Sequence, residues 1–510
     1  MKVLFTTVLF LLISLVSFAQ QDGINLLTCG TPPHISDWLK RHQAAPAEFR
    51  SGGDTLLWIP HSVHLVGQDD GTGYFPISKT LEALCTLNQD YEPTQIQYFL
   101  PGEFHYINNS EWNNHPHVTI GYEMMLANDI AGTVNSYLVS DPSGYCGYNL
   151  PYGSVVVKNG CADAAEHTWA HEVGHFLSLP HPFYGWETLD YDFNTPTPFT
   201  VINDAYTFFQ DTVVWDTTAS ILDTNYVELM DYSNSTIAAD LFTDTRPDYI
   251  SYRWPCGADN FSNLLQKDPN GVEFQSDGTL IMSYAYDNCQ NRFSDEQVIA
   301  MRANIFDEYP ELLTAYEPLP LVTSTTSIPV TPLPEDIVDP SLVHLEWTAT
   351  ENATHYLLQL TRFSSFAIIE HEILVTTNSA DVYDLLENKT YRWRIKAFNS
   401  NSFCTTFTEG SLFQTGEINT STSDFQSDHF RVFPTILKAG SAIQVIPTES
   451  VTTDWMIQLY DLKGVELYRS EAGADAIRTI NTENMEYGIY FMALTGKDFG
   501  REVYKVVIVQ

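Results

Sequence analysis

The pattern of apolar and polar residues divides the chain into a mixed N-terminal part and a strand-rich C-terminal part. Between residues 54 and 161, apolar runs rich in β-branched residues alternate with stretches of helical spacing such as ISKTLEALCTLNQDY. This alternation predicts the α+β fold class, with a mixed sheet. SDEQVIAMRANIFDEY closes this part as a helix, because Ser294 and Gln297 have the spacing of a capping box.

Two polar linkers mark the predicted domain boundaries, YEPLPLVTSTTSIPVTPLPEDIVDP and GEINTSTSDFQSD. Alternating apolar and polar residues after each linker predict strands, as in TYRWRIKAFN and REVYKVVIVQ, so we expect two all-β sandwich domains. The expected order is a short propeptide, an α+β domain and two β-domains, over residues 20–50, 51–315, 325–416 and 425–510.

The first residues predict export. Lys2 precedes an apolar run, and Ser17 and Ala19 are small residues of the kind that signal peptidase accepts, so we expect a signal peptide over residues 1–19. A membrane anchor is the alternative, although a run of about 15 apolar residues is short for a bilayer. No later segment is long and apolar enough, so we expect an exported protein with no integral membrane segment after cleavage.

The net charge and the number of cysteines limit which partners and which disulfide chemistry we expect for this chain. The chain holds 24 Lys and Arg against 64 Asp and Glu, a formal net charge of -40. Such a surface repels nucleic acid and anionic membranes, so neither is an expected partner. Seven cysteines in an exported chain allow disulfides and leave at least one cysteine over, and proximity in sequence suggests a disulfide between Cys146 and Cys161.

The segment HEVGHFLSLPH, residues 171–181, carries the candidate chemistry. We expect a helix over residues 163–178, with Asp163 as its cap and Glu166 completing a capping box. Four-residue spacing then places His171 and His175 on one side of the helix, where two imidazoles can hold one zinc ion.

Two further residues of this segment complete a predicted catalytic metal site. Pro180 prevents a smooth continuation of the helix, so the chain can turn back and offer His181 as a third ligand. Three protein ligands leave a fourth position for water, and Glu172 can take a proton from that water. The alternative is a histidine-rich, solvent-exposed helix face. His167 also lies on the His171 side, and we expect it to be a supporting or surface group and not a ligand.

This segment resembles the extended zinc signature of the metzincin metallopeptidases, His-Glu-x-x-His-x-x-Gly-x-x-His. GTLIMSYAYDNCQNRFSDEQVIAMR further resembles the methionine turn of the pappalysin family. The resemblance implies that Met282 forms an apolar floor below the ligands and that Tyr284 stabilises the oxyanion; Met230 in VELMDYSNS is the competing methionine. Ser178 departs from the signature glycine, and a positive φ there would cost about 1 kcal/mol.

The resemblance also assigns roles to cysteines. Cys256 and Cys289 match positions that are paired in pappalysins. TCGTPP resembles the propeptide segment of some bacterial pappalysins, in which a thiolate on the zinc silences the enzyme. Cys29 is therefore a candidate cysteine switch, with pairing to Cys85 or Cys404 as the alternative.

Calcium is a second expected cofactor, because bacterial relatives in this family bind it between the zinc helix and the methionine turn. The segment ADLFTDTRPD offers hard oxygen ligands from Asp240, Asp244, Thr245 and Asp248. An acidic loop that is merely solvated is the alternative.

The C-terminal modules resemble two other families. LVHLEWTATENATHYLLQLTRF and LLENKTYRWRIKAFN are similar to a fibronectin type III sandwich. RVFPT, IQLYDLKGVELYRSE and YKVVIVQ resemble the C-terminal sorting domain of the Bacteroidetes type IX secretion route, with an ordinary β-sandwich as the alternative. The sorting resemblance implies that the secretion machinery is a partner. It also implies that the protein is secreted, or attached to the cell surface, after passing the outer membrane.

These features predict a secreted zinc endopeptidase that hydrolyses peptide bonds in proteins or peptides, with Glu172 as the base. The rival hypothesis is a surface adhesin whose zinc site is structural or inert and whose sandwiches bind the partner. The intact Glu172 favours the enzyme, because a binding protein has no use for that base.

Overall fold

The computed structural model describes most of the chain from Cys29 onward, in two compact units whose main boundary lies between Ala315 and Tyr316. The expected signal peptide, residues 1–19, lies outside the described residues. The described residues are 29–150, 154–187, 189–205, 208–209, 212–213, 221–322, 327–417, 425–426, 429–448, 451–474, 476–483 and 485–509.

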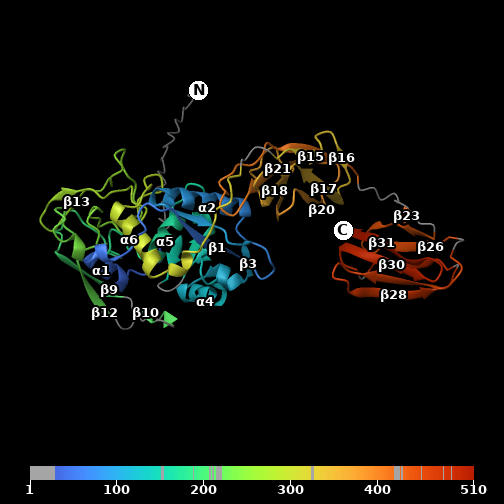
Figure 1. Cartoon of the computed structure of the whole chain (residues 1–510), viewed down its shortest axis with the longest axis horizontal. Coiled ribbons are helices and arrows are strands. Elements are labelled where there is room, and N and C mark those ends of the chain that lie inside the picture. The colour runs from blue at the N-terminus through green and yellow to red at the C-terminus, as the bar shows by residue number, and fades with distance from the viewer. Residues whose placement is uncertain are drawn as a thin grey trace, which may run out of the picture. The chain divides into compact units, whose positions relative to one another are not determined.

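A six-stranded mixed sheet forms the centre of the first unit, in the order β2–β1–β5–β8–β7 (Figure 1). Strands β2 and β3 pair in parallel with successive halves of β1, and β5 and β8 continue the parallel arrangement. Strand β7 is an antiparallel edge strand beside β8. The strands are β1 Leu57–Gly67, β2 Ile96–Phe99, β3 His105–Asn108, β5 Val134–Val139, β7 Gly147–Asn149 and β8 Val155–Lys158.

Helices cover this sheet, which explains why β1 and β5 are buried along almost their whole length. Tyr122 and Met125 of α4 pack in one core with Tyr137 and Tyr148 of the sheet. Helix α5 lies against β7 and β8. The helices are α1 Asp37–Ala44, α2 Ile77–Tyr91, α3 Ser110–Asn113, α4 Val118–Asn128, α5 Thr168–Phe176 and α6 Asp295–Asp307.

Helix α5 is shorter than the sequence suggested. It begins at Thr168, after His167, and not at Asp163. The Asp163 carboxylate accepts a hydrogen bond from Ala164 N at 2.7 Å, and its carbonyl accepts one from Glu166 N at 3.2 Å. The expected capping box is therefore wrong, because the aspartate bonds to its own neighbour and forms a turn instead.

The closing helix α6 follows its sequence pattern. The Ser294 side chain accepts from Gln297 N, and the Gln297 side chain accepts from Ser294 N, so the expected capping box is present. The reciprocal pair satisfies two backbone donors that an isolated helix end would leave exposed.

A long irregular segment connects α5 to α6 and has a hydrophobic core of its own around Tyr249, Trp254 and Phe274. Trp186 stacks on Tyr249 with ring centroids 4.9 Å apart. Short strands of this segment and of the preceding loops are β4 Asn114–His115, β6 Asp141–Pro142, β9 Thr200–Ala205, β10 Phe208–Phe209, β11 Thr212–Val213, β12 Ile221–Tyr226, β13 Gln266–Lys267 and β14 Glu273–Phe274.

The second unit contains two β-sandwiches, as the alternating pattern predicted. In the first, the sheets β15–β17–β20 and β16–β22–β21–β18–β19 enclose a core around Trp347, Tyr391 and Trp393. Its strands are β15 Pro329–Thr331, β16 Ile337–Val338, β17 Leu342–Trp347, β18 His355–Thr361, β19 His371–Val375, β20 Ser379–Tyr383, β21 Thr390–Phe398 and β22 Ser411–Thr415.

The second sandwich pairs the sheets β23–β24–β26–β29 and β25–β31–β30–β27–β28 around Trp455. Its strands are β23 Phe425–Gln426, β24 Phe430–Phe433, β25 Ile436–Lys438, β26 Ala442–Pro447, β27 Trp455–Tyr460, β28 Glu466–Ala472, β29 Arg478–Asn481, β30 Gly488–Gly496 and β31 Gly500–Val509. Across the described residues, no helix has the length and apolar character needed to cross a bilayer.

Candidate metal centre

Helix α5 points its aromatic side into the sheet and its histidines away from it. Trp169 Nε1 donates to Ser136 Oγ of β5 at 2.9 Å, and Val173 and Leu177 continue the buried side. His171 and His175 lie about half a turn round from Trp169, because successive helical residues are rotated by about 100°. The burial of the apolar side therefore fixes the direction of both imidazoles.

Met282 packs directly under this helix, as the resemblance implied. Its side chain is completely buried, and a Cβ on Gly174 would lie 2.4 Å from its Sδ, so only glycine allows this approach. The preceding carbonyl, Ile281 O, accepts from His171 Nδ1 at 2.8 Å. The competing methionine, Met230, packs against the core of the irregular segment instead.

A tight turn after α5 brings His181 back to the helix. Ser178 has a φ of 70°, the left-handed conformation that the signature glycine would adopt without strain. Leu179 N donates to Gly174 O at 3.0 Å, and the Ser178 hydroxyl accepts from Asn304 Nδ2 of α6 at 3.2 Å. These contacts hold a serine in a conformation that is strained for any residue with a Cβ.

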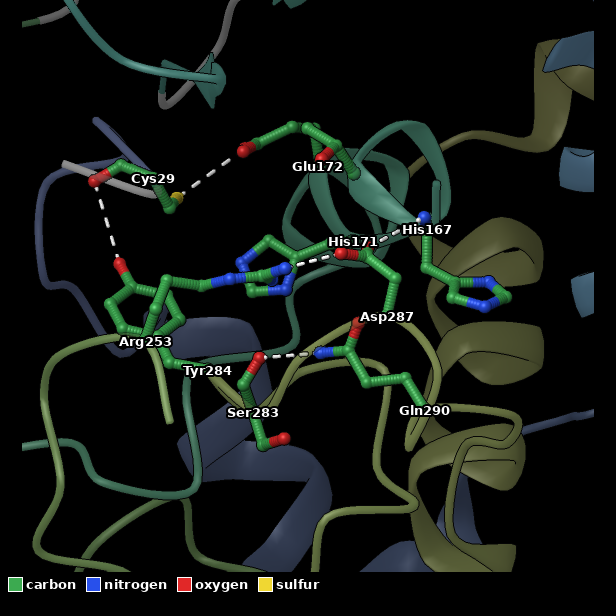
Figure 2. A pocket seen from close by; sticks show the side chains of 10 residues that line it. Cys29, His167, His171, Glu172, Arg253, Ser283, Tyr284, Asp287 and Gln290 are labelled. Atoms are coloured by element: carbon green, nitrogen blue, oxygen red, sulfur yellow. Dashed lines mark hydrogen bonds and ion pairs between the residues drawn. The ribbon is translucent and has the colours of Figure 1, made fainter. Parts of the chain in front are cut away.

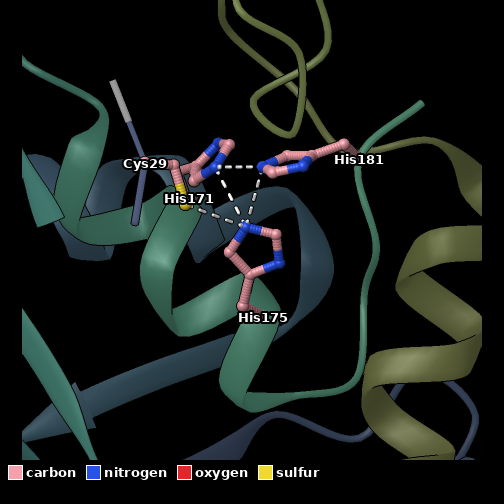
Figure 3. A group of neighbouring side chains, drawn as sticks. All are labelled: Cys29, His171, His175 and His181. Atoms are coloured by element: carbon pink, nitrogen blue, oxygen red, sulfur yellow. Dashed lines mark hydrogen bonds between the residues drawn. The ribbon is translucent and has the colours of Figure 1, made fainter. Parts of the chain in front are cut away.

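Three imidazole nitrogens converge at this turn (Figure 3). The Nε2 atoms of His171, His175 and His181 lie 3.1 to 3.2 Å from one another. Cys29 Sγ lies 3.5 Å from His175 Nε2, and the four ligand atoms all fall within 4.8 Å of each other. Residues from three separate segments therefore offer ligand atoms to one point.

The hydrogen bonds of the Nδ1 atoms determine whether each Nε2 atom carries a proton or a lone pair. His171 Nδ1 lies 2.8 Å from Ile281 O, and His175 Nδ1 lies 2.7 Å from Leu179 O. Because a carbonyl oxygen only accepts, each Nδ1 must carry the proton, and each Nε2 of a neutral ring is then a lone pair. Converging lone pairs repel one another unless a cation lies between them.

The spacing of the cluster fits a tetrahedral ion. Zn–N bonds of about 2.0 Å and a Zn–S bond of about 2.3 Å place tetrahedral nitrogens about 3.3 Å apart and put sulfur about 3.5 Å from nitrogen. The observed separations are 3.1 to 3.2 Å between nitrogens and 3.5 Å from sulfur to His175 Nε2. The residues present thus fit zinc in ligand type, number and distance.

Burial keeps the three rings neutral. It lowers the pKa of His171 to about 4, and it lowers the pKa of His175 and His181 well below the usual range. Nearby histidines lower the last two pKa values further. Neutral imidazole is the form that binds a metal, so these residues need lose no proton at neutral pH.

Glu172 sits beside the cluster without joining it. Its side chain is buried, and burial raises its pKa to about 8. A Cβ on Gly147 of β7 would lie 2.8 Å from Glu172 Cγ, so the bare glycine makes room for the carboxylate. A cation at the histidines would lower the pKa of Glu172 again, because it favours the charged form.

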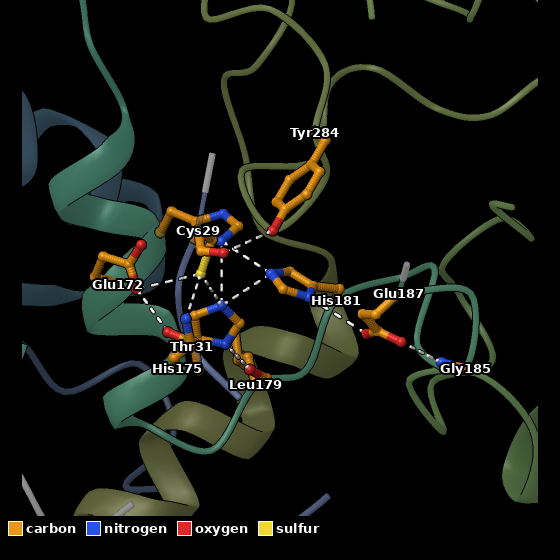
Figure 4. A network of polar contacts seen from close by, with 10 residues as sticks. Cys29, Thr31, Glu172, His175, Leu179, His181, Gly185, Glu187 and Tyr284 are labelled. Atoms are coloured by element: carbon orange, nitrogen blue, oxygen red, sulfur yellow. Dashed lines mark hydrogen bonds and ion pairs between the residues drawn. The ribbon is translucent and has the colours of Figure 1, made fainter. Parts of the chain in front are cut away.

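The segment from Cys29 to Thr31 lies along the edge strand β7 and covers the cluster (Figure 4). Gly30 N donates to Gly147 O at 2.8 Å, and Asn149 N donates to the Thr31 hydroxyl at 2.8 Å. The Thr31 hydroxyl in turn donates to Glu172 Oε2 at 2.9 Å. Burial and the Glu172 charge raise the pKa of the Cys29 thiol, which donates to the same oxygen at 3.6 Å.

Tyr284 faces the cluster from the methionine turn. Its ring centroid lies 4.9 Å from that of His181, and its hydroxyl donates to Cys29 O at 3.5 Å. The hydroxyl therefore reaches the backbone carbonyl of Cys29, whose sulfur lies at the cluster, and the expected role of Tyr284 with an oxyanion stays a prediction.

A pocket opens beside the cluster and is lined by charged and polar groups (Figure 2). Arg253 pairs with Asp287 in its wall, and His167 N donates to Asp287 Oδ1 at 3.1 Å. His167 Nδ1 lies 2.8 Å from Asp90 Oδ2, a contact that raises the histidine pKa although burial lowers it. His167 is thus a supporting group, as expected, and not a fourth imidazole of the cluster.

Two buried carboxylates lie near each other in the irregular segment. Glu228 and Asp240 are almost fully buried, and Glu228 Oε2 and Asp240 Oδ2 have no hydrogen-bond partner among the described residues. Burial raises the pKa of both groups, and the Asp240 charge raises that of Glu228 further. Ala239 and Leu241, on either side of Asp240, have φ values of 46° and 68°, a strain typical of functional loops.

The other expected calcium ligands divide between this pair and the surrounding structure. Thr245 Oγ1 donates to Asp240 Oδ1 at 2.9 Å, so it belongs with the pair. Asp244 caps α6, accepting from Ser294 Oγ at 2.7 Å and from Glu296 N at 2.8 Å. Asp248 accepts from Ser276 Oγ at 2.7 Å and from Ile250 N at 2.9 Å through Oδ1. Its buried Oδ2, like one oxygen of each member of the pair, has no hydrogen-bond partner among the described residues.

Both suggested disulfides are present. Cys146 is bonded to Cys161, which ties the start of β7 to the turn before α5, and Cys256 is bonded to Cys289. Cys29 is the free cysteine of the described residues.

Three residues that contact this chemistry were not found by sequence reasoning. Thr31 follows Cys29 in the quoted TCGTPP, but nothing in that motif indicates a bond to Glu172. Glu187 lies outside the quoted motifs, and Glu228 lies in VELMDYSNS, which was considered only for Met230. Burial distinguishes both from other acidic residues. An acidic residue in an otherwise apolar run, as in YVELM, is a signal that could have indicated Glu228.

Comparison with known proteins finds likeness to β-sandwiches. No protein-family model matches the chain, and no curated protein matches it. An immunoglobulin-like β-sandwich protein of the duf3244 family from Bacteroides vulgatus is 22% identical, covering 15% of this chain and 82% of its own, with a TM-score of 0.14.

Two fibronectin type III domains are similar to part of the chain as well. That of human contactin 1 is 16% identical over 22% of this chain and 93% of its own, with a TM-score of 0.17. The domain of the human collagen alpha-1(XX) chain is 21% identical and covers 22% of this chain and 96% of its own, with a TM-score of 0.14. At these scores the likeness carries no argument about the fold or the function of the chain.

The strain at Ser178 can be measured by comparing two substitutions. Ser178→Gly and Ser178→Ala both lose the hydroxyl that Asn304 contacts, but only alanine keeps a Cβ in the left-handed conformation. The glycine variant should exceed the alanine variant in free energy of unfolding by about 1 kcal/mol, measured by denaturant titration. Ser110 is the control position, because it is the first residue of α3 and its φ is not positive. There the alanine variant should be more stable than the glycine variant. Equal stability of the two variants at Ser178 would contradict the turn described.

Proposed function

We propose that the first unit is a zinc endopeptidase. The observation that carries the proposal is the convergence of three neutral imidazole lone pairs at 3.1 to 3.2 Å, two of them oriented by carbonyl acceptors. A buried carboxylate stands beside this cluster, and a pocket opens next to it. Three histidines and one exchangeable position are typical of catalytic zinc, whereas structural sites are closed by four permanent protein ligands.

His171, His175 and His181 would hold the ion, which supplies Lewis-acid polarisation of the scissile carbonyl and a water that is acidic at neutral pH. Glu172 takes the proton of the attacking water and passes it to the leaving amine, a role that suits a carboxylate close to the ligands but not bound as one. The Tyr284 hydroxyl, which reaches the backbone carbonyl of Cys29, donates to the developing oxyanion.

The chain described here is the latent form of that enzyme. Cys29 Sγ lies at the fourth corner of the cluster, where a thiolate excludes water. Thr31 adds a second restraint, because its hydroxyl donates to the Glu172 oxygen that would accept the proton of the water. Loss of the segment before the first strand frees both positions at once. The expected propeptide, residues 20–50, contains this segment.

Calcium is the cofactor that best fits the buried carboxylate pair. Glu228 Oε2 and Asp240 Oδ2, both without a partner among the described residues, are hard ligands, and two uncompensated carboxylates in a protein interior call for a cation. Thr245 lies close enough to Asp240 to complete the set with backbone carbonyls of the strained loop. Asp244, whose two oxygens both accept hydrogen bonds, acts as a structural acceptor in this proposal.

Export through the type IX secretion route, with release or surface attachment, is proposed from the N-terminal signal pattern and the resemblance of residues 425–510 to a sorting domain. The β-sandwich around Trp455 is compatible with that assignment. The substrates would then be extracellular proteins or peptides, and the fibronectin-like sandwich a spacer or an aid to their binding.

Gelatin hydrolysis tests the proposed reaction. The full chain carrying Cys29→Ser should cleave gelatin, a zinc chelator should stop it, and added zinc should restore it. Glu172→Gln in the same chain should lower the rate by roughly 100- to 10,000-fold, which is the usual contribution of a general base. Asp192→Asn, an exposed carboxylate on the following loop, serves as the control and should retain full activity. Zinc bound at one per chain with no cleavage in any variant would favour the adhesin.

Latency can be measured without removing any residues. Full-length chain should be nearly inactive on gelatin, Cys29→Ser should be active before any cut in the chain, and Thr31→Val should show partial activity with Cys29 intact. The Cys29 thiol should also resist alkylation until a chelator is added, because the metal holds it as a ligand. Equal activity of the full-length chain and Cys29→Ser would exclude the switch.

Calcium should change both the stability and its pH dependence. The pKa values of Glu228 and Asp240 are raised by folding, so the folded state binds more protons above the ordinary carboxyl range, and stability falls as pH rises. Calcium at about 100 times its Kd should add about 2.7 kcal/mol, and thus raise the unfolding temperature by several degrees. Glu228→Gln with Asp240→Asn should abolish the calcium shift and flatten the pH dependence between pH 5 and roughly 8. An unchanged calcium shift in this double variant would place the ion elsewhere.

A further inference from the structure

The three clustered histidines differ in what their outer nitrogens contact. His171 and His175 each face a backbone carbonyl, at 2.8 and 2.7 Å. His181 Nδ1 faces a carboxylate instead, with Glu187 Oε1 3.5 Å away (Figure 4). One ring of the three therefore faces a side-chain carboxyl group and not a backbone carbonyl.

The chain between these two residues is folded so as to bring them together. Tyr184 N donates to His181 O at 3.0 Å and Trp186 N donates to Phe183 O at 2.9 Å, which makes two successive turns. The turns return Glu187, six positions further on, to the side of the His181 ring that is opposite the cluster.

The carboxylate and the ring are both held in place. Gly185 N donates to Glu187 Oε2 at 2.7 Å, which leaves Oε1 as the oxygen nearer the ring. The His181 ring stacks on Phe183 with centroids 4.5 Å apart and planes 13° from parallel. Only 11% of the Glu187 side chain is exposed, and burial raises its pKa to about 8. A cation at the cluster would favour the charged form of this carboxyl group.

We propose that Glu187 is a positioning residue for the metal, whose carboxylate accepts the Nδ1–H of His181 and fixes the Nε2 lone pair toward the ion. The 3.5 Å separation closes to hydrogen-bond length with a small side-chain rotation. A carboxylate also makes the imidazole a stronger donor to a cation than a carbonyl does, so His181 becomes the strongest of the three ligands. The inference rests on the proposed zinc site and concerns affinity for the ion, not the reaction.

Zinc affinity tests this role without any substrate. In the full chain carrying Cys29→Ser, zinc is titrated against a chromophoric chelator to obtain Kd. Glu187→Gln, which keeps an acceptor but no charge, should raise Kd by about tenfold, and Glu187→Ala by up to about 100-fold. Asp190→Asn removes an exposed charge from the same loop and is the matched control, with an unchanged Kd.

A second measurement tests the proposal if one of the variants folds poorly. Nuclear magnetic resonance of the ring N–H groups should show the His181 Nδ1–H protected from exchange in the zinc-bound chain and exchanging fast in Glu187→Gln, with the His171 and His175 signals unchanged. Values of Kd within twofold for all four proteins, or an unaltered His181 signal, would overturn the proposal. Zinc binding without gelatin cleavage would remove the peptidase and leave Glu187 to be decided by Kd. A chain that binds no zinc would overturn both.

Discussion

The convergence of three neutral imidazoles is the constraint on which the first unit depends. Three Nε2 lone pairs within 3.2 Å of one another repel. The rings of His171 and His175 resist rotating away because the Nδ1 of each is hydrogen-bonded to a carbonyl oxygen. The acceptors come from different parts of the chain: the methionine turn supplies Ile281 O and the turn after α5 supplies Leu179 O. The strained Ser178 and the close contact of Gly174 with Met282 bring these acceptors to the rings. A cation at the centre turns this repulsion into attraction, so the same contacts that look unfavourable alone become a preformed site.

Sequence spacing predicted the parts of this site that depend on local geometry. One helical turn separates His171 from His175, and Pro180 breaks the helix, so two ligands and the turn toward the third follow from a single segment. The helix start at Asp163 was predicted wrongly, since a side chain that can cap a helix can equally bond to its own neighbour. Propensity does not decide between these outcomes, and the contact of His167 with Asp90 and Asp287, from distant segments, is what places the first turn at Thr168.

Residues that only the tertiary structure brings together could not be predicted from the sequence. The acidic set predicted for calcium was chosen for closeness in sequence, but Asp244 caps α6 and Asp248 bonds Ser276, while Glu228 from another segment joins Asp240. In a chain with 64 acidic residues, the amino-acid sequence alone cannot distinguish a solvated carboxylate from a buried one. What distinguishes them is whether their oxygens have hydrogen-bond partners. Both oxygens of Asp244 accept hydrogen bonds, whereas one oxygen each of Glu228, Asp240 and Asp248 has no partner in the described part of the chain. Unsatisfied buried groups are uncommon enough in folded proteins that each calls for an explanation.

The same reasoning explains why the covering segment suits the proposed latent state. Burial raises the pKa values of both Cys29 and Glu172, and the Glu172 charge raises that of Cys29 further. A divalent ion at the histidines reverses this for the thiol, whose sulfur is already at ligand distance from the cluster. Gly30 and Thr31 hold that sulfur by bonding to the edge strand β7, the one strand of the central sheet with a free side next to the histidines. An extended substrate would need the same strand edge and the same corner of the cluster, so inhibitor and substrate are mutually exclusive. Latency in this proposal is competition for one strand edge, and it ends when the covering segment is no longer tethered to the chain.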